Sequence, residues 1–294
     1  MKPEPVMLIG AGPAGLAAAI QLKRYGIHPL LFESAEAGGL VRNANLVENY
    51  PGFPKGITGM KLADLFIRQA QNLDIEVIHE KVIDLVYVDD QFQARTAKNT
   101  YESLTVIIAT GTKPCSLQSI AIPEELTDRV FYEVWDLLHI KDKTMAIIGS
   151  GDAAFDYALN LSKKNQVIIL NRGEHPKCLP LLWERVQNVA GIRYQYRTEV
   201  SRVRNDVAGG MLVDCQSGAG ELQFHADYLV GAIGREPCVD FLPEALLQQA
   251  QSLEEQEVLF RVGDVKNGLF RQTSIAVGEG VLAAMKICRK LSEK

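Results

Sequence analysis

Short apolar runs alternate with glycine-rich turns and longer amphipathic stretches along this chain. Residues 6–9 read Val-Met-Leu-Ile, and after a glycine-rich turn an Ala- and Leu-rich stretch continues to about Tyr25. A second apolar run covers residues 29–32. Short apolar runs bounded by turn residues are typical of buried strands, whereas the longer stretch is typical of a helix. The pattern predicts a strand, a helix and a second strand.

The same pattern returns in the middle of the chain. Residues 144–148 form an apolar run, a helical stretch follows to about Lys163, and residues 167–170 are again apolar. Two such units in one chain are far more specific than a single glycine-rich turn. We therefore predict two dinucleotide-binding folds.

The first glycine turn has the spacing that a dinucleotide requires. Gly10 allows a tight turn, Gly12 lets the backbone approach a pyrophosphate, and Gly15 permits close packing of the helix. Glu33 ends the second predicted strand, where a carboxylate can bind ribose hydroxyls. This unit is predicted to bind an adenosine diphosphate group.

The second turn differs at the position that selects the nucleotide. Gly149, Gly151 and Ala154 repeat the turn, but Asn171 stands where a carboxylate would favour NAD. Arg172 follows it, and a guanidinium can bind a 2′-phosphate through two parallel donors. The pattern favours NADP over NAD.

The remaining apolar runs indicate how the two units are connected. Runs at 104–108 and 228–234 each end where one domain passes to the other, and a strand at 258–264 precedes a final helix from about Ser274. That last part has no nucleotide fold of its own, so it is expected to complete the first domain. We predict an α/β protein of two Rossmann-like domains of the three-layer ββα type, the first comprising 1–114 and 239–294 and the second, 115–238, inserted in it.

Composition excludes several other classes. The 294 residues carry a net charge of −5 without a basic block, which gives no electrostatic footprint for nucleic acid or an anionic membrane. No apolar run approaches the roughly 18 to 20 residues of a membrane span, so a cytoplasmic protein is expected. The five cysteines are scattered without zinc-ligand spacing, and we expect no metal and reduced thiols.

Three further segments resemble segments of the low-molecular-weight thioredoxin reductase family. Together with the two glycine turns, they extend this resemblance over essentially the whole chain. They are Glu-Asn-Tyr-Pro-Gly-Phe-Pro at 48–54, Gly263-Asp264 and Arg271-Gln272. The resemblance implies FAD in the first domain, NADPH (or NADH) in the second, a homodimer, and domain rotation about hinges near 113–114 and 235–237. The residues implied for FAD are Gly10, Gly12, Pro13, Ala14, Gly15, Glu33, Gly39, Asn49, Thr110, Gly111, Gly263, Asp264, Arg271 and Gln272. Those implied for NADP are Gly149, Gly151, Asp152, Ala153, Ala154, Arg172 and Lys177.

One departure from the family bears on the activity. The family's Cys-x-x-Cys-Asp segment corresponds to residues 132–136 here, with Tyr132 and Trp135 at the two cysteine positions and Asp136 at the position of the aspartate. The rings of Tyr132 and Trp135 cannot perform thiol-disulfide exchange. The segment resembles the Tyr-x-Val-x-Asp-Leu stretch of thioredoxin-reductase-like ferredoxin-NADP reductases, which implies a ferredoxin or flavodoxin as acceptor.

Several alternatives remain open. The acceptor could be a small molecule such as a quinone, the protein could be a flavin-binding redox sensor, or Cys115 or Cys178 could act with a disulfide partner. Tyr132 and Trp135 are candidates for flavin stacking or electron relay, with interdomain packing as the alternative. Asp136 is a candidate proton donor, with a helix N-cap or a surface role as the alternative.

Overall fold

The computed structural model describes residues 4–293, which form two compact units. The first unit comprises the chain up to Arg42, Val47–Lys113 and the chain from Glu236 onward, and the second comprises Asn43–Leu46 and Pro114–Arg235. The predicted junctions, after residues 114 and 238, lie one and three residues beyond these. The inclusion of Asn43–Leu46 in the second unit has no counterpart in the sequence pattern.

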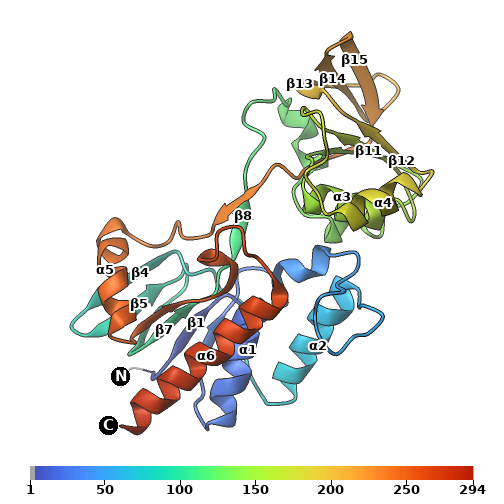
Figure 1. The fold of residues 1–294 in the computed structure, drawn as a ribbon. Coiled ribbons are helices and arrows are strands. Elements are labelled where there is room, and N and C mark those ends of the chain that lie inside the picture. Colours follow the sequence, from blue (N-terminus) through green and yellow to red (C-terminus); the bar gives the residue numbers. More distant parts are fainter. Residues whose placement is uncertain (1–3, 294) are drawn as a thin grey trace. The chain divides into compact units, whose positions relative to one another are not determined.

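A five-stranded parallel sheet in the order β18-β7-β1-β2-β3 forms the centre of the first unit (Figure 1). Its strands are β1 (Met7–Ile9), β2 (Leu30–Phe32), β3 (Val77–Ile78), β7 (Val106–Ile108) and β18 (Leu259–Arg261). Strand β18 pairs with β7, so the C-terminal part of the chain completes the first sheet as predicted. The predicted strand at 258–264 is shorter, because the 3₁₀ turn η4 (Gly263–Val265) replaces its end.

Alternate side chains of this sheet enter two separate cores. Leu8, Leu31 and Ile107 pack with apolar side chains of the helices α1 (Pro13–Arg24) and α6 (Thr273–Ser292). Helix α2 (Gly59–Gln71) lies beside α1 (Figure 1). Met7, Ile9 and Ile108 instead pack on the other face, which is covered by a three-stranded antiparallel sheet and one helix. Those elements are β4 (Asp84–Val88), β5 (Gln91–Arg95), β6 (Thr100–Ser103) and α5 (Glu244–Glu255).

The second unit repeats this architecture. Its parallel sheet has the order β12-β11-β10-β16-β9, with helices packed on one face and an antiparallel sheet on the other. The parallel strands are β9 (Val130–Phe131), β10 (Thr144–Ile148), β11 (Gln166–Leu170), β12 (Ile192–Gln195) and β16 (Tyr228–Gly231). The covering elements are α3 (Asp152–Leu161), α4 (Pro180–Gln187), β13 (Thr198–Asn205), β14 (Met211–Ser217) and β15 (Gly220–Ala226). The predicted fold class of two three-layer Rossmann-like units is confirmed.

Two strands connect the units. They are β8 (Thr112–Pro114) and β17 (Arg235–Pro237), which form a two-stranded sheet. Three further 3₁₀ turns are η1 (Gly39–Asn43), η2 (Glu124–Arg129) and η3 (Trp135–Leu137). Within residues 4–293, no helix has the length and apolarity needed to span a membrane.

Candidate functional site

The first glycine turn contains two kinds of glycine. Gly10 has a φ of +104°, and a Cβ atom there would lie 2.4 Å from the carbonyl oxygen of Ala109. At Gly15 a Cβ would lie 1.9 Å from the carbonyl oxygen of Gly10. Gly12 is different, because its nearest neighbour to a Cβ is the Cα of Gly39 at 3.8 Å. Packing therefore requires glycine at 10 and 15, whereas at 12 the protein itself leaves room for a side chain.

The open position faces a helix end suited to an anion. Gly12 is the N-cap of α1, Pro13 opens the helix, and the first turn contains no acidic residue. Amide groups at such an end have no intrahelical acceptors and present a partial positive charge. A close backbone approach at Gly12 fits the pyrophosphate of a dinucleotide.

Glu33 connects the second strand to this turn. Its Oε2 accepts a hydrogen bond from the Ala11 amide at 2.8 Å, and its Oε1 accepts one from the Ala35 amide at 3.0 Å. Both bonds fix the carboxylate at the carboxyl end of β2, next to the glycine turn. This placement fits a carboxylate that binds the ribose of an adenosine.

Residues far apart in sequence meet elsewhere in the first unit. Asn49 Nδ2 donates to Gln272 Oε1 at 2.7 Å, which joins two residues that the resemblance assigns to FAD. Thr110 Oγ1 donates to the carbonyl of Cys238 at 2.7 Å, and the Gly263 amide donates to Glu279 Oε2 at 2.6 Å. Gly10, Glu33, Thr110 and Gly263 all follow parallel strands, whose carboxyl ends share one edge of the sheet.

The other residues assigned to FAD lie in the same unit. Ala14 is a buried residue of α1, Gly39 opens η1, and Gly111 has a φ of +64° beside Thr110. Asp264 lies in η4, and Arg271 precedes Gln272, the N-cap of α6. The first unit therefore contains the whole set predicted for FAD.

The second glycine turn repeats the arrangement of the first. Gly149 has a φ of +155°, and a Cβ there would lie 2.4 Å from the carbonyl oxygen of Ala232. At Gly151, the N-cap of α3, a Cβ would meet no atom within 4 Å. The fully buried Ala154 occupies the third position. As at Gly12, packing within the unit does not require a glycine at position 151.

A neighbouring segment lies along this turn. The Lys177 amide donates to the carbonyl of Ser150 at 2.7 Å, and the Leu179 amide donates to Asp152 Oδ1 at 2.7 Å. Asp152 and Ala153 are the first residues of α3. Lys177, predicted for NADP, is thereby held beside the glycine turn.

Asn171 organises the loop that follows β11. Its buried side chain donates through Nδ2 to the His175 carbonyl at 3.0 Å and the Tyr194 hydroxyl at 2.8 Å, and its Oδ1 accepts from the Gly173 amide at 2.8 Å. Arg172 is exposed on this loop. Asn171 therefore shapes the loop from within, and Arg172 is left accessible to a ligand.

The segment at 132–136 is packed into the second unit. The Tyr132 hydroxyl accepts from the Leu117 amide at 3.0 Å, and its ring lies against Gly231, where a Cβ would approach ring atoms to 2.7 Å. Val134 is fully buried. Asp136 lies exposed inside η3, whose N-cap is Val134, so the helix-cap alternative for Asp136 is wrong.

Glu133 is the polar centre of this segment and had no predicted role. Its carboxylate pairs with Arg235 at 2.6 Å, accepts from Asn43 Nδ2 at 2.6 Å and lies 3.5 Å from the Tyr157 hydroxyl. Asn43 Oδ1 in turn accepts from the amides of Val134 and Trp135 at 2.9 and 3.1 Å. Burial, followed by the charge of Glu133, raises the pKa of Tyr157. These contacts of Asn43, Tyr157 and Arg235 carry no signal in the local sequence.

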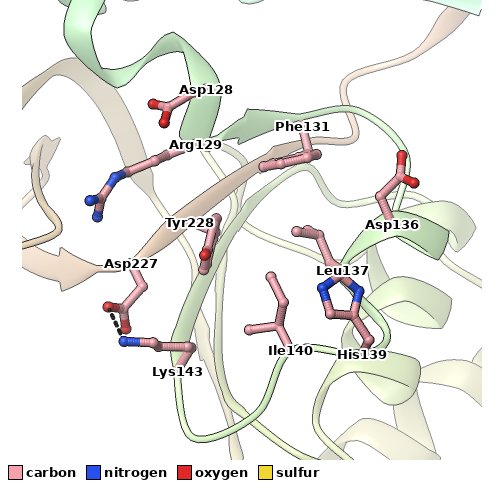
Figure 2. Close-up of a pocket in the computed structure, with 10 residues that line it drawn as sticks. All are labelled: Asp128, Arg129, Phe131, Asp136, Leu137, His139, Ile140, Lys143, Asp227 and Tyr228. Carbon is pink, nitrogen blue, oxygen red and sulfur yellow. Dashed lines mark hydrogen bonds and ion pairs between the residues drawn. The ribbon is translucent and has the colours of Figure 1, made fainter.

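A cleft of about 500 Å³ opens at the other end of the second unit's sheet. Lys143 and Asp227 precede β10 and β16, so the cleft lies at their amino ends, opposite the glycine turn. Figure 2 shows apolar and charged side chains around it, including the ion pair of Lys143 and Asp227 at 3.3 Å. Its polar lining consists of three carboxylates, two cations and one imidazole, which belong to Asp128, Asp136, Asp227, Arg129, Lys143 and His139. Because these charges nearly balance, the cleft favours no single sign of ligand.

Burial disfavours the thiolate form of three of the five cysteines, which are Cys178, Cys215 and Cys238. Burial, with Asp152 as the next cause, raises the pKa of Cys178, which disfavours the thiolate needed for exchange. All five cysteines are free. Among residues 4–293, no group of three His, Cys, Asp or Glu side chains is arranged to hold a metal ion.

Residues 4–280 match the model of the pyridine nucleotide-disulphide oxidoreductases, and the chain belongs to this family. A thioredoxin reductase of Streptomyces coelicolor is 32% identical over 95% of this chain and 91% of its own. The NADPH-dependent thioredoxin reductase 3 of Arabidopsis thaliana is 30% identical over 98% of this chain, which spans 58% of that protein. The crystal structure of T. acidophilum thioredoxin reductase matches with a TM-score of 0.83 and 26% identity over 99% of each chain. The chain is thus a thioredoxin reductase-like flavoprotein oxidoreductase, and this part of the predicted resemblance is confirmed.

Proposed function

We propose that this protein is an FAD-dependent oxidoreductase that takes electrons from NADPH and passes them through the flavin to an acceptor. One observation carries the proposal: Gly12 and Gly151 each occupy a glycine turn at a position where the protein's own packing leaves room for a side chain. The close approach of a pyrophosphate to the protein backbone at each turn explains both glycines. When bound, FAD accepts a hydride from the nicotinamide and releases electrons singly or in pairs.

The protein's own residues position the two nucleotides. Gly10, Gly12 and Gly15 form the turn for the FAD pyrophosphate, and Glu33 holds its ribose at the end of β2. Gly149, Gly151 and Ala154 form the turn for the donor. Arg172 and Lys177 supply positive charge for a 2′-phosphate, which favours NADPH over NADH. The two connecting strands are the proposed hinges for bringing donor and flavin together.

The first test is anaerobic stopped-flow reduction of the purified yellow protein by NADPH and by NADH, followed at about 450 nm, where oxidised flavin absorbs. We expect rapid bleaching by NADPH and slower bleaching by NADH. Gly151→Ala should impair reduction by both donors with normal FAD content. Wild-type protein that binds FAD but is bleached by neither donor would overturn the donor assignment.

For the acceptor we propose a ferredoxin or flavodoxin. The chain contains no Cys-x-x-Cys, and Tyr132 and Trp135 stand where the family resemblance places the redox disulfide. Electrons therefore have to leave the flavin without an internal dithiol. Cytochrome c reduction that requires both NADPH and added ferredoxin would support this acceptor, whereas quinone reduction without any protein partner would favour a small-molecule acceptor.

A disulfide partner is the second candidate, because the relatives described above are named thioredoxin reductases. Reduction of insulin disulfides that depends on added thioredoxin would support it. Cys115→Ser and Cys178→Ser then test whether a thiol of this chain takes part. If neither substitution changes disulfide reduction, these two thiols have no role in it.

We also propose that the protein is a homodimer. Ile275, Leu282 and Met285 are 38%, 54% and 49% exposed on α6, at spacings that place them along one face of the helix. Burying such a stripe against a second copy would remove apolar area from water. Light scattering should give twice the chain mass for wild type and a monomer for Leu282→Glu combined with Met285→Glu.

A further inference from the structure

The loop after β11 contains one carboxylate among several basic side chains. In the stretch 171–178 the acid is Glu174, and Arg172, His175 and Lys177 are the basic residues. All four side chains belong to exposed residues. A 2′-phosphate at this loop would therefore meet the cations of Arg172 and Lys177, with Glu174 as the one carboxylate of the stretch.

A second guanidinium reaches the loop from outside it. Arg197 lies between β12 and β13, and its amide donates to the carbonyl of Gly173 at 2.8 Å. Its φ of +49° is in the left-handed region, which is uncommon for a residue with a side chain. The Thr198 amide also donates to the Asn171 carbonyl at 2.9 Å. The backbone of Arg197 is thus fixed against the loop that Asn171 shapes.

Glu174 holds the side chain of Arg197. The Arg197 guanidinium is hydrogen-bonded to Glu174 Oε1, and both side chains are 59% exposed. His175 Nε2 lies 3.9 Å from the other carboxylate oxygen. An ion pair at this exposure contributes little to stability, so another anion can replace the Glu174 carboxylate beside Arg197 at small cost in free energy.

We propose that Glu174 and Arg197 form an exchangeable ion pair that sets how strongly the site prefers a 2′-phosphorylated adenosine. This rests on the proposed binding of the donor nucleotide at the second glycine turn. A 2′-phosphate displaces the Glu174 carboxylate and takes the Arg197 guanidinium as a second cation beside Arg172. A 2′-hydroxyl carries no charge and leaves the pair intact.

The sign of each substitution follows from this competition. Glu174→Gln removes both the competing acceptor and a negative charge, so the 2′-phosphate binds more tightly. Arg197→Gln removes the cation, so the 2′-phosphate binds more weakly. In the double variant the gain in affinity from Glu174→Gln disappears, because that gain comes mainly from the Arg197 guanidinium that the substitution releases.

Isothermal titration of the FAD-loaded full chain with 2′,5′-ADP and with 5′-AMP tests the proposal without relying on turnover. We expect Glu174→Gln to tighten 2′,5′-ADP about fivefold and Arg197→Gln to weaken it about tenfold, with 5′-AMP changed less than about twofold in each. Glu199→Gln is the matched control, because it removes an exposed carboxylate two residues from Arg197. It should change the affinity for 2′,5′-ADP by less than about twofold, since no contact with Arg197 is lost.

The outcomes separate the two levels of the proposal. If the wild-type protein binds neither nucleotide, nucleotide binding at the second turn is wrong, and the role of the ion pair is wrong with it. If the wild type binds 2′,5′-ADP but Arg197→Gln does not weaken it, the ion-pair proposal alone is overturned. An equal gain from Glu174→Gln and Glu199→Gln would also overturn it, because a general charge effect would then explain both.

Discussion

Asn49 and Gln272 are hydrogen-bonded at 2.7 Å across 223 residues of sequence. Ser274 Oγ also reaches the Asn49 carbonyl at 3.4 Å, so the segment at 48–54 is attached to the start of α6. Asn49 and Gln272 both belong to the set assigned to FAD. The contact shows that two widely separated motifs form one part of the first unit.

Asn49→Ala should therefore loosen FAD more than it loosens the fold. Asn49 is exposed, so loss of its bond to Gln272 should cost about 1 kcal/mol or less of unfolding free energy. The freed Gln272 and the displaced segment at 48–54 should raise the dissociation constant for FAD about tenfold. Flavin fluorescence titration of flavin-free protein measures the constant, and Asn72→Ala, at the end of α2, is the control. Equal FAD affinity in wild type and Asn49→Ala would contradict the assignment.

Gly12→Ala and Gly15→Ala should separate ligand binding from folding. A methyl group at Gly12 meets the Gly39 Cα at an ordinary 3.8 Å, and the φ of −77° at Gly12 suits alanine. We expect Gly12→Ala to fold with normal stability and to lose FAD, because the methyl group would occupy the place of the pyrophosphate. Gly15→Ala places its Cβ 1.9 Å from the Gly10 carbonyl oxygen and should lose about 3 kcal/mol of unfolding free energy.

Urea unfolding of the flavin-free proteins, together with the flavin content after purification, tests this pair. A Gly12→Ala protein that retains FAD at wild-type affinity would remove the main support for the dinucleotide site. A Gly15→Ala protein as stable as wild type would contradict the packing argument.

The local sequence pattern was sufficient to predict the strands and helices that flank the two glycine turns. The strands before Gly10 and Gly149 and the helices after them lie within about two residues of their predicted positions, because apolar runs and glycine turns are local signals. The parallel strand at 258–264 was also correctly assigned to the first sheet, although it proved shorter. Glu33 follows β2 as predicted, and its carboxylate accepts from the Ala11 amide of the glycine turn, while its binding of a ribose stays a prediction.

Contacts between distant segments could not be predicted in the same way. The bonds of Asn43 to residues 133–135 span about ninety positions, and nothing in the local pattern near Asn43 signals them. The role of Asn171 in its loop also depends on a distant partner. The sequence shows that position 171 lacks a carboxylate, whereas the buried hydrogen bond of its side chain requires Tyr194. The sequence identifies a residue type at a position, whereas the partner depends on the tertiary fold.

Asp156 should make the stability of the second unit depend on pH. Burial raises its pKa to about 6, although the Asn45 amide at 2.8 Å, Lys163 and Arg185 favour the charged form, and Asp152 opposes it. Because the pKa in the folded state is above that of the unfolded chain, the folded state binds the proton more tightly. The resulting stabilisation is present below about pH 4 and is lost as the pH rises through about 6.

Asp156→Asn should therefore stabilise the protein at pH 8 by about 2 kcal/mol, and the difference should shrink toward pH 5. The amide oxygen of asparagine can still accept from the Asn45 amide, so the geometry is preserved. Urea midpoints at pH 8 and pH 5 measure the effect, with Asp128→Asn, an exposed carboxylate of the same unit, as control. A stabilisation that is identical at both pH values would exclude the raised pKa as its cause.

Tyr132→Phe distinguishes a packing role from an electron-relay role at the position where the family resemblance places a cysteine. The substitution keeps the ring against Gly231 but removes the hydroxyl that accepts from the Leu117 amide at 3.0 Å. Leu117 is 5% exposed, so its amide would be left without that acceptor in a buried setting, at a cost of about 2 kcal/mol of unfolding free energy. If Tyr132 serves packing, stability falls and the rates of flavin reduction and acceptor reduction are unchanged. Tyr196→Phe, at a tyrosine that is 59% exposed, is the control and should change neither quantity. A fall in acceptor reduction at unchanged stability would instead show that the phenol participates in electron transfer, since phenylalanine keeps the ring and lacks the oxidisable hydroxyl.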